Sequence, residues 1–169
     1  AMFFYVTNSR WQGLVHRFKY SGKWQIAYSM GRWYGSLLKE SGLYTDIDVI
    51  VPVPLHPIKI LKRGYNQSRY IAEGMAKEMG VKVDACSVRR LRNNPSQARN
   101  TATARWANVE SLFGVRRTEA LRAKHILVVD DVLTTGATIT SCIQAIKAAL
   151  PDCRVSVAAL STTIRRERM

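Results

Sequence analysis

Two adjacent aspartates followed by a loop of small polar residues are the part of this chain that most clearly suggests chemistry. Residues 126–138 read ILVVDDVLTTGAT, so an apolar run leads directly into Asp130 and Asp131. The loop behind them contains Gly136, which lets the backbone approach a ligand closely. Free backbone amides at the start of a following helix attract negative charge. The segment therefore predicts a site for a phosphate group.

The acids and the loop have different roles in this prediction. Carboxylates repel phosphate, so Asp130 and Asp131 are expected to contact the hydroxyl groups of a ligand, or a Mg²⁺ ion that bridges phosphate oxygens. The phosphate itself is expected on the loop, whose members are Thr134, Thr135, Gly136, Ala137 and Thr138. A sugar phosphate lying across the end of a strand would bring its hydroxyl groups to the aspartates and its phosphate to the loop. The segment has neither the Gly-x4-Gly-Lys pattern nor GxGxxG, and a purely structural loop is the alternative interpretation.

The surrounding elements are those of an α/β protein. We expect strands at residues 49–54, 81–88, 125–130 and 153–160, and helices at residues 66–79, 101–108 and 137–150. Strands that alternate with helices imply a mostly parallel sheet with helices on both faces. Ligands of such sheets collect beyond the carboxyl ends of the strands, which is where the two aspartates are expected.

Residues 1–44 differ from the rest of the chain in their aromatic content and in the spacing of their apolar residues. They hold 11 of the 15 aromatic residues, and their apolar positions recur at helical spacing around residues 14–18 and 26–38. We expect two amphipathic helices here, separated near residues 20–23. Their aromatic side chains either belong to the core or line a ligand site.

The charge of the chain is strongly positive, because 26 lysines and arginines stand against 12 acids and give a formal net charge of +14. The electrostatic field of a chain with this positive charge attracts nucleic acid, a membrane surface or a phosphate-rich small molecule. No acid occurs between residues 86 and 108, where five arginines gather: Arg89, Arg90, Arg92, Arg99 and Arg105. This segment is interpreted as an anion-facing loop, with an ordinary solvated surface as the alternative.

Cysteine spacing and hydropathy exclude several classes of protein. Cys86, Cys142 and Cys153 are odd in number, far apart and without a CxxC pair, which argues against a disulfide framework and against a zinc site in this chain. No apolar run approaches the roughly 20 residues of a membrane-spanning helix, and no secretory signal opens the sequence. A single compact domain in the cytoplasm, without membrane insertion, is expected.

Residues 126–138, ILVVDDVLTTGAT, resemble the signature with which type I phosphoribosyltransferases bind phosphoribosyl pyrophosphate (PRPP). Residues 51–72, VPVPLHPIKILKRGYNQSRYIA, resemble the ComF family (competence protein F), a branch of those enzymes, as do residues 16–24, HRFKYSGKW. Further matches to the family are Gln97, Arg105, Asn108 and Phe113. The resemblance covers nearly the whole chain. It implies the type I phosphoribosyltransferase fold, with an N-terminal hood at residues 1–44 and the phosphoribosyltransferase core at residues 45–169.

The resemblance also implies a role for each part of the site. Asp130 and Asp131 would hold the ribose hydroxyls and, directly or through PRPP, the Mg²⁺ ion, while residues 134–138 would hold the 5′-phosphate. Pyrophosphate would lie on the group formed by Pro54, Leu55, His56, Lys62 and Arg63. Asn66 is interpreted either as the cap of the next helix or as a ligand contact.

The arginine-rich segment has a counterpart in the loop that closes over PRPP in catalytic relatives. Arg99 and Arg105 would then be the catalytic residues, supplying positive charge to the departing pyrophosphate. Relatives in the ComF family usually carry an N-terminal zinc domain with four cysteines, and the cysteines here predict none in this chain.

Two functions follow as expectations from the resemblance. The first is transfer of a 5-phosphoribosyl group from PRPP with release of pyrophosphate, in a protein that serves DNA uptake. The second is a non-catalytic accessory protein of natural transformation that binds PRPP or single-stranded DNA and contacts competence proteins. The acceptor of the phosphoribosyl group and the oligomeric state stay open.

Overall fold

A parallel β-sheet forms the centre of the molecule in a computed structural model, which describes residues 3–5, 23–92 and 112–163. The sheet has the strand order β1-β7-β6-β2-β3, and every neighbouring pair is parallel. Its strands are β1 (Phe3–Tyr5), β2 (Val49–Pro52), β3 (Lys82–Val83), β6 (His125–Leu133) and β7 (Arg154–Thr163). The expected α/β class with a mostly parallel sheet is confirmed.

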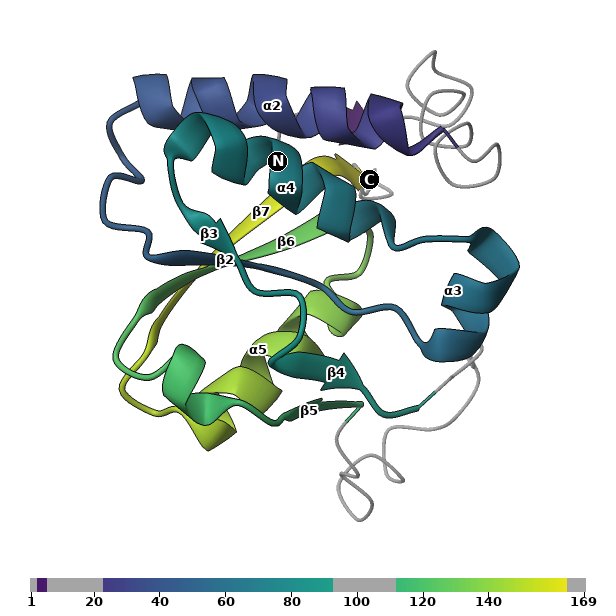
Figure 1. Ribbon diagram of the computed structural model, residues 1–169, viewed down its shortest axis with the longest axis vertical. Helices are drawn as coiled ribbons and strands as arrows, with labels where there is room; N and C mark the ends of the chain where they lie inside the picture. The colour runs from purple at the N-terminus through teal and green to yellow at the C-terminus, as the bar shows by residue number, and fades with distance from the viewer. Residues whose placement is uncertain (1–2, 6–22, 93–111, 164–169) are drawn as a thin grey trace, which may run out of the picture.

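Helices cover both faces of this sheet (Figure 1). Helices α2 (Trp24–Glu40) and α4 (Gln67–Met79) lie on one face, and α5 (Ala137–Ala149) lies on the other. The short helix α3 (Pro57–Arg63) follows β2, and a 3₁₀ turn at Thr118–Ala120 precedes β6. Within the described ranges, none of the helices is both long and apolar enough to cross a membrane.

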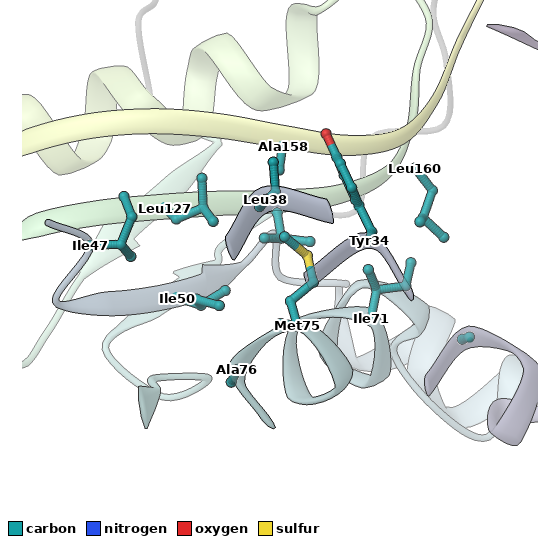
Figure 2. Packing of buried hydrophobic residues seen from close by; sticks show 13 residues of the cluster. Tyr34, Leu38, Ile47, Ile50, Ile71, Met75, Ala76, Leu127, Ala158 and Leu160 are labelled. Carbon is teal, nitrogen blue, oxygen red and sulfur yellow. The ribbon is translucent and has the colours of Figure 1, made fainter. Parts of the chain in front are cut away.

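The core on the α2–α4 face is packed unusually tightly at glycines. A Cβ atom added to Gly31 would lie 2.2 Å from the carbonyl oxygen of Ile71, and one added to Gly74 would lie 2.2 Å from that of Tyr28. The two helices therefore pack backbone against backbone. Figure 2 shows the side chains that fill the space beneath them, among them Tyr34, Leu38, Ile50, Ile71, Met75 and Leu127.

A second core lies between the sheet and α5. Val128 and Ile126 of β6 face it, and Ile146 of α5 and Phe113 are fully buried in it. Alternate residues of β6 thus serve different cores, because successive side chains of a strand point to opposite faces of the sheet. This double burial is why β6 reads as a continuous apolar run in the sequence.

All four expected strands differ from the observed ones in their bounds: β2 ends at Pro52 instead of residue 54, and β7 covers Arg154–Thr163 instead of residues 153–160. Strand β6 does not end at Asp130 but continues to Leu133, because β7 runs to Thr163 and keeps pairing with it. The expected strand at residues 81–88 is instead divided. Asp84 accepts hydrogen bonds from the amides of Cys86 and Ser87, each at 2.9 Å, and the resulting turn separates β3 from the next strand.

The strand behind that turn belongs to a separate hairpin. Strand β4 (Val88–Arg90) pairs antiparallel with β5 (Phe113–Val115) and forms a two-stranded sheet of its own.

Helix α3 was not expected either. It begins because the His56 Nδ1 accepts a hydrogen bond from the Ile58 amide at 3.3 Å, and it ends at Gly64, whose φ is 86°.

The remaining helix predictions divide into tested and untested ones. Helices α2, α4 and α5 confirm the expected helices around residues 26–38, 66–79 and 137–150. The helices expected around residues 14–18 and at residues 101–108 lie outside the described residues.

Candidate functional site

The carboxylate of Asp130 is held in place from two sides. Its Oδ1 accepts a hydrogen bond of 2.9 Å from the hydroxyl of Ser68 and another of 2.9 Å from the backbone amide of Asp131. The Asp131 carboxylate in turn accepts from the amide of Val132 at 2.8 Å. Both aspartates are half-buried. These hydrogen bonds fix the orientation of both carboxylates.

The loop behind the aspartates leads directly into helix α5. Gly136 adopts a φ of 78° and forms the N-terminal cap of the helix, and its carbonyl oxygen accepts the first helical hydrogen bond from Thr140. The first turn of α5 contains no acid. Thr134 and Thr135 are exposed, and Thr138 is half-buried. The positive end of the helix therefore faces solvent beside threonine hydroxyls, as an anion site requires.

Strand β7 fixes the base of this loop. The Thr162 hydroxyl donates to the carbonyl oxygen of Leu133 at 3.2 Å, and the Thr163 hydroxyl donates to that of Thr134 at 3.4 Å. The first of these hydrogen bonds lies within the last regular pair of β6 and β7, and the second extends the contact one residue beyond it. The loop consequently starts from an anchored position next to the aspartates.

The segment before α4 connects β2 to the acid pair. Asn66 caps α4, because its Oδ1 accepts from the Ser68 amide at 3.2 Å, and its Nδ2 donates to the carbonyl oxygen of Val53 at 3.0 Å. This confirms Asn66 as the expected helix cap. An Arg63 Nη1 donates to Gln67 Oε1 at 2.9 Å, so the end of α3 is joined to the same turn.

The residues expected to hold pyrophosphate occupy different positions. Pro54 and Leu55 line a cleft at the end of β2, whereas His56 uses its ring nitrogen to cap α3. Lys62 and Arg63 lie in the last turn of α3, the first exposed and the second half-buried. Arg63 is joined through Gln67 to the turn that carries Ser68, and Lys62 lies on the outer surface of α3.

Electrostatic effects show which groups lie around Asp130. Burial lowers the pKa of Arg90, and the negative charge of Asp130 opposes this change. Burial also raises the pKa of the Cys142 thiol to about 12, with a smaller contribution from Asp130 in the same direction and an opposing one from Arg90. The Arg90 guanidinium also lies 5.4 Å from the centre of the Phe113 ring. The half-buried Arg90 guanidinium is thus near enough to Asp130 for the two charges to interact.

Ser68 is the site residue that sequence reasoning missed. It is 62 positions away from Asp130, and its hydroxyl is nearly fully buried. The signal was present in the triplet Asn66-Gln67-Ser68, because a cap at Asn66 places Ser68 in the first turn of α4. Arg90 was noted only as one of five loop arginines. The two expected catalytic residues, Arg99 and Arg105, lie outside the described residues.

The acid pair suits one particular mode of Mg²⁺ binding. Among the described residues, no group of three or more His, Cys, Asp or Glu side chains converges as a metal cage would. Mg²⁺ is often bound by one or two carboxylates, with its other ligands taken from water and from substrate phosphates. Asp130 and Asp131 suit that mode of binding, since they are two adjacent carboxylates whose orientation is fixed by hydrogen bonds.

Comparisons with known proteins show the family of the chain. The family model described as "Phosphoribosyl transferase domain" matches residues 65–168. The DNA utilization protein YhgH of Salmonella typhimurium is 32% identical over 138 residues, which cover 78% of this chain and 58% of that protein. The competence protein ComFC of Bacillus subtilis is 29% identical over 136 residues, covering 80% and 52%.

Among solved structures, a glutamine PRPP amidotransferase from B. subtilis has a TM-score of 0.55 at 16% identity, covering 85% of this chain and 30% of that one. This likeness shows the fold. The chain spans between half and three fifths of the length of the two curated relatives. The family match covers more than half of the chain and includes the acid pair, residues 134–138 and the first turn of α4. The chain therefore belongs to the phosphoribosyl transferase domain family, and its curated relatives include a competence protein and a DNA utilization protein.

Proposed function

We propose that this chain binds PRPP together with Mg²⁺ and transfers its 5-phosphoribosyl group with release of pyrophosphate. The observation that carries the proposal is the anchored Asp130 carboxylate beside the acid-free start of α5. Groups suited to a sugar, at the end of β6, are thereby followed directly by groups suited to its phosphate, in the loop that leads into α5.

Each half of the site has a physical role in binding. The carboxylates of Asp130 and Asp131 accept hydrogen bonds from the ribose hydroxyls, and the amides of residues 136–138 with the threonine hydroxyls hold the 5′-phosphate. A bound Mg²⁺ ion neutralises charge on the pyrophosphate oxygens. Because Ser68 and the Asp131 amide already fix the orientation of Asp130, less conformational freedom is lost when the sugar binds.

The transfer itself needs positioning and charge stabilisation more than a side-chain base. The bond between C1 of the ribose and the pyrophosphate oxygen breaks, and the acceptor forms the new bond to C1. The cations proposed for the leaving group are Lys62, Arg63, Arg99 and Arg105, and preorganised positive charge is the usual means of stabilising such a group. We assign the choice of acceptor to the hood at residues 1–44, from which α2 packs on α4.

Calorimetry with PRPP and Mg²⁺ tests the proposal. The double variant Asp130→Asn with Asp131→Asn keeps the shape of both side chains but removes both charges, and we expect it to abolish detectable PRPP binding. Asp152→Asn is the matched control, since Asp152 is exposed in the turn before β7. Equal PRPP affinity in the double variant and the wild type would refute the site. Pyrophosphate release, screened against purines, pyrimidines and amines, then identifies the acceptor.

A second candidate function is that of an accessory protein for single-stranded DNA in the cytoplasm, in contact with competence proteins. Its support is the names of the relatives, together with the exposed arginines Arg89, in β4, and Arg92, which follows β4. Such binding weakens steeply with salt, because each phosphate contact releases counterions. Oligonucleotide binding measured at several salt concentrations distinguishes the two functions, since a protein that handles only PRPP has no oligonucleotide affinity at physiological salt.

A further inference from the structure

The side chain of Gln67, in the first turn of α4, is buried with only one end of its amide group hydrogen-bonded. It is 1% exposed, and its Oε1 accepts a hydrogen bond of 2.9 Å from Nη1 of Arg63. Its Nε2 is buried too and has no hydrogen-bond partner among the residues that the structure describes. A guanidinium can only donate, so the oxygen end of the amide must face Arg63. The contact with Arg63 therefore turns the NH₂ group towards a place without an acceptor.

This arrangement makes the folded protein less stable than it could be. A buried donor without an acceptor loses the hydrogen bonds that water gives it in the unfolded chain, which is why most buried polar groups are paired. Helix α4 does not need an amide at this position, because the side chain of Asn66 already caps it. A methionine has a similar length and would leave no polar group unpaired. The stability of α4 thus does not explain a glutamine here, whereas the contact with Arg63 does.

Arg63 gains a buried anchor through this contact. It lies half-buried in the last turn of α3, directly before Gly64, and none of the residues of α3 is buried. Gln67 belongs to α4, which packs into the core beneath α2 through Ile71 and Met75. The hydrogen bond therefore joins a side chain of an exposed helix to one of a packed helix. Because arginine has many rotamers, holding it in advance reduces the conformational freedom that is lost when an anion binds.

Gln67 holds Arg63 without cancelling its charge. The comparison is Arg69, which has the same spacing to its own partner four residues later and donates to the carboxylate of Glu73 at 2.8 Å. A carboxylate offsets the positive charge that it pairs with, and the attraction of that pair for an anion falls accordingly. An amide oxygen accepts the same hydrogen bond and adds no negative charge. The neutral contact therefore leaves the charge of Arg63 available to a ligand.

We propose that Gln67 is a positioning residue, which holds the Arg63 guanidinium in place for the pyrophosphate group of PRPP and leaves its charge to that group. The inference rests on the proposed function, in which Arg63 is one of the cations for pyrophosphate. It adds that a side chain without contact to the ligand sets the affinity of one half of the site, and that the fold is less stable because of it.

Gln67→Met separates binding from folding. The variant removes the acceptor for Arg63 together with the unpaired NH₂ group, and Gln144→Met, at an exposed position of α5, is the matched control. We expect calorimetry to show an affinity for pyrophosphate with Mg²⁺ about tenfold or more below that of the wild type, the scale of one hydrogen bond to a charged group. The affinity for ribose 5-phosphate should stay unchanged, and the urea midpoint should equal or exceed the wild-type value. A lower urea midpoint, or an unchanged pyrophosphate affinity, would overturn the proposal.

Two further variants show whether Gln67 acts through the charge of Arg63. Gln67→Glu keeps an acceptor but adds a negative charge, so we expect weaker pyrophosphate binding, with a larger deficit at low salt than at high salt. Arg63→Met should weaken pyrophosphate binding by itself, and adding Gln67→Met to it should have no further effect. Wild-type affinity in Gln67→Glu, or an equal loss from Gln67→Met with and without Arg63, would contradict the proposed role.

Failure of this inference is distinguishable from failure of the proposed function. If the wild type binds PRPP and the Asp130→Asn, Asp131→Asn variant does not, while Gln67→Met binds pyrophosphate as the wild type does, only the role of Gln67 is wrong. If the wild type binds neither PRPP nor pyrophosphate, the proposed site is wrong, and the role of Gln67 is wrong with it.

Discussion

The hydroxyl of Ser68 donates a hydrogen bond of 2.9 Å to the carboxylate of Asp130, and so joins the first turn of α4 to the carboxyl-terminal part of β6. The same turn is capped by Asn66, which also bonds to the loop after β2. One short segment therefore sets the distance between the end of β2 and the acid pair. In the proposed function, the end of β2 binds the pyrophosphate of PRPP and the acid pair binds its ribose.

Ser68→Ala tests this connection. The substitution removes one of the two hydrogen bonds to Asp130 Oδ1 and leaves the charge in place, so the carboxylate gains rotational freedom. We expect PRPP affinity to fall about tenfold or more, since a hydrogen bond to a charged group contributes about 1.5–3 kcal/mol. Ser29→Ala, at an exposed position of α2, is the control. If Ser68→Ala binds PRPP as the wild type does, Ser68 does not position the carboxylate.

Gly136 offers a test of the phosphate loop that separates folding from binding. Both Gly136, with φ 78°, and Gly42, with φ 67°, are left-handed, and a Cβ atom on either would meet nothing closer than 3.9 Å. Alanine at either position should therefore cost a similar 1–2 kcal/mol of unfolding free energy, roughly the price of a left-handed residue. We expect only Gly136→Ala to weaken PRPP binding. Urea unfolding and calorimetry on both variants check this, and equal PRPP affinities would contradict the loop assignment.

Much of the fold followed from patterns that act over short distances. Buried strands such as β2 and β6 are apolar because both faces of the sheet are covered, and α4 and α5 carry apolar residues at helical spacing. The bounds that were wrong depended on partners elsewhere in the chain. Strand β6 continues past Asp130 only because β7 is long enough to pair with it, and nothing in residues 126–133 reveals this.

The candidate site divides in the same way. The acid pair and the loop lie within one segment, so their types and order were readable from the sequence. Ser68 and the cleft at the end of β2 were not, because the contact with Asp130 spans 62 positions and the cleft is assembled from four separate elements. The effect of Asp84 was not readable from the sequence either. Its hydrogen bonds to Cys86 and Ser87 are local, but the turn they form places β4 outside the main sheet and against the cleft.

The Asp84 turn makes a prediction about pH. Burial alone would raise the pKa of Asp84, but hydrogen bonds from the Ser87 hydroxyl and from the amides of Cys86 and Ser87, aided by the charge of Arg117, outweigh it and hold the pKa below the usual 3.8. A folded-state pKa below the unfolded value means that the unfolded chain binds the proton more readily. The stabilisation is thus complete above the unfolded pKa and is lost as the pH falls through the folded one.

We therefore expect the urea midpoint of the wild type to drop as the pH falls from about 5 towards 3, and Asp84→Asn to show a smaller drop from a lower starting value. Asparagine keeps an oxygen that accepts from the two amides but removes the charge that strengthens those hydrogen bonds. Glu40→Gln, at the exposed end of α2, controls for the general effect of removing an acid from a basic protein. If Asp84→Asn follows the same pH curve as the wild type, the turn is held by its backbone alone, and the ionised carboxylate does not fix the position of β4.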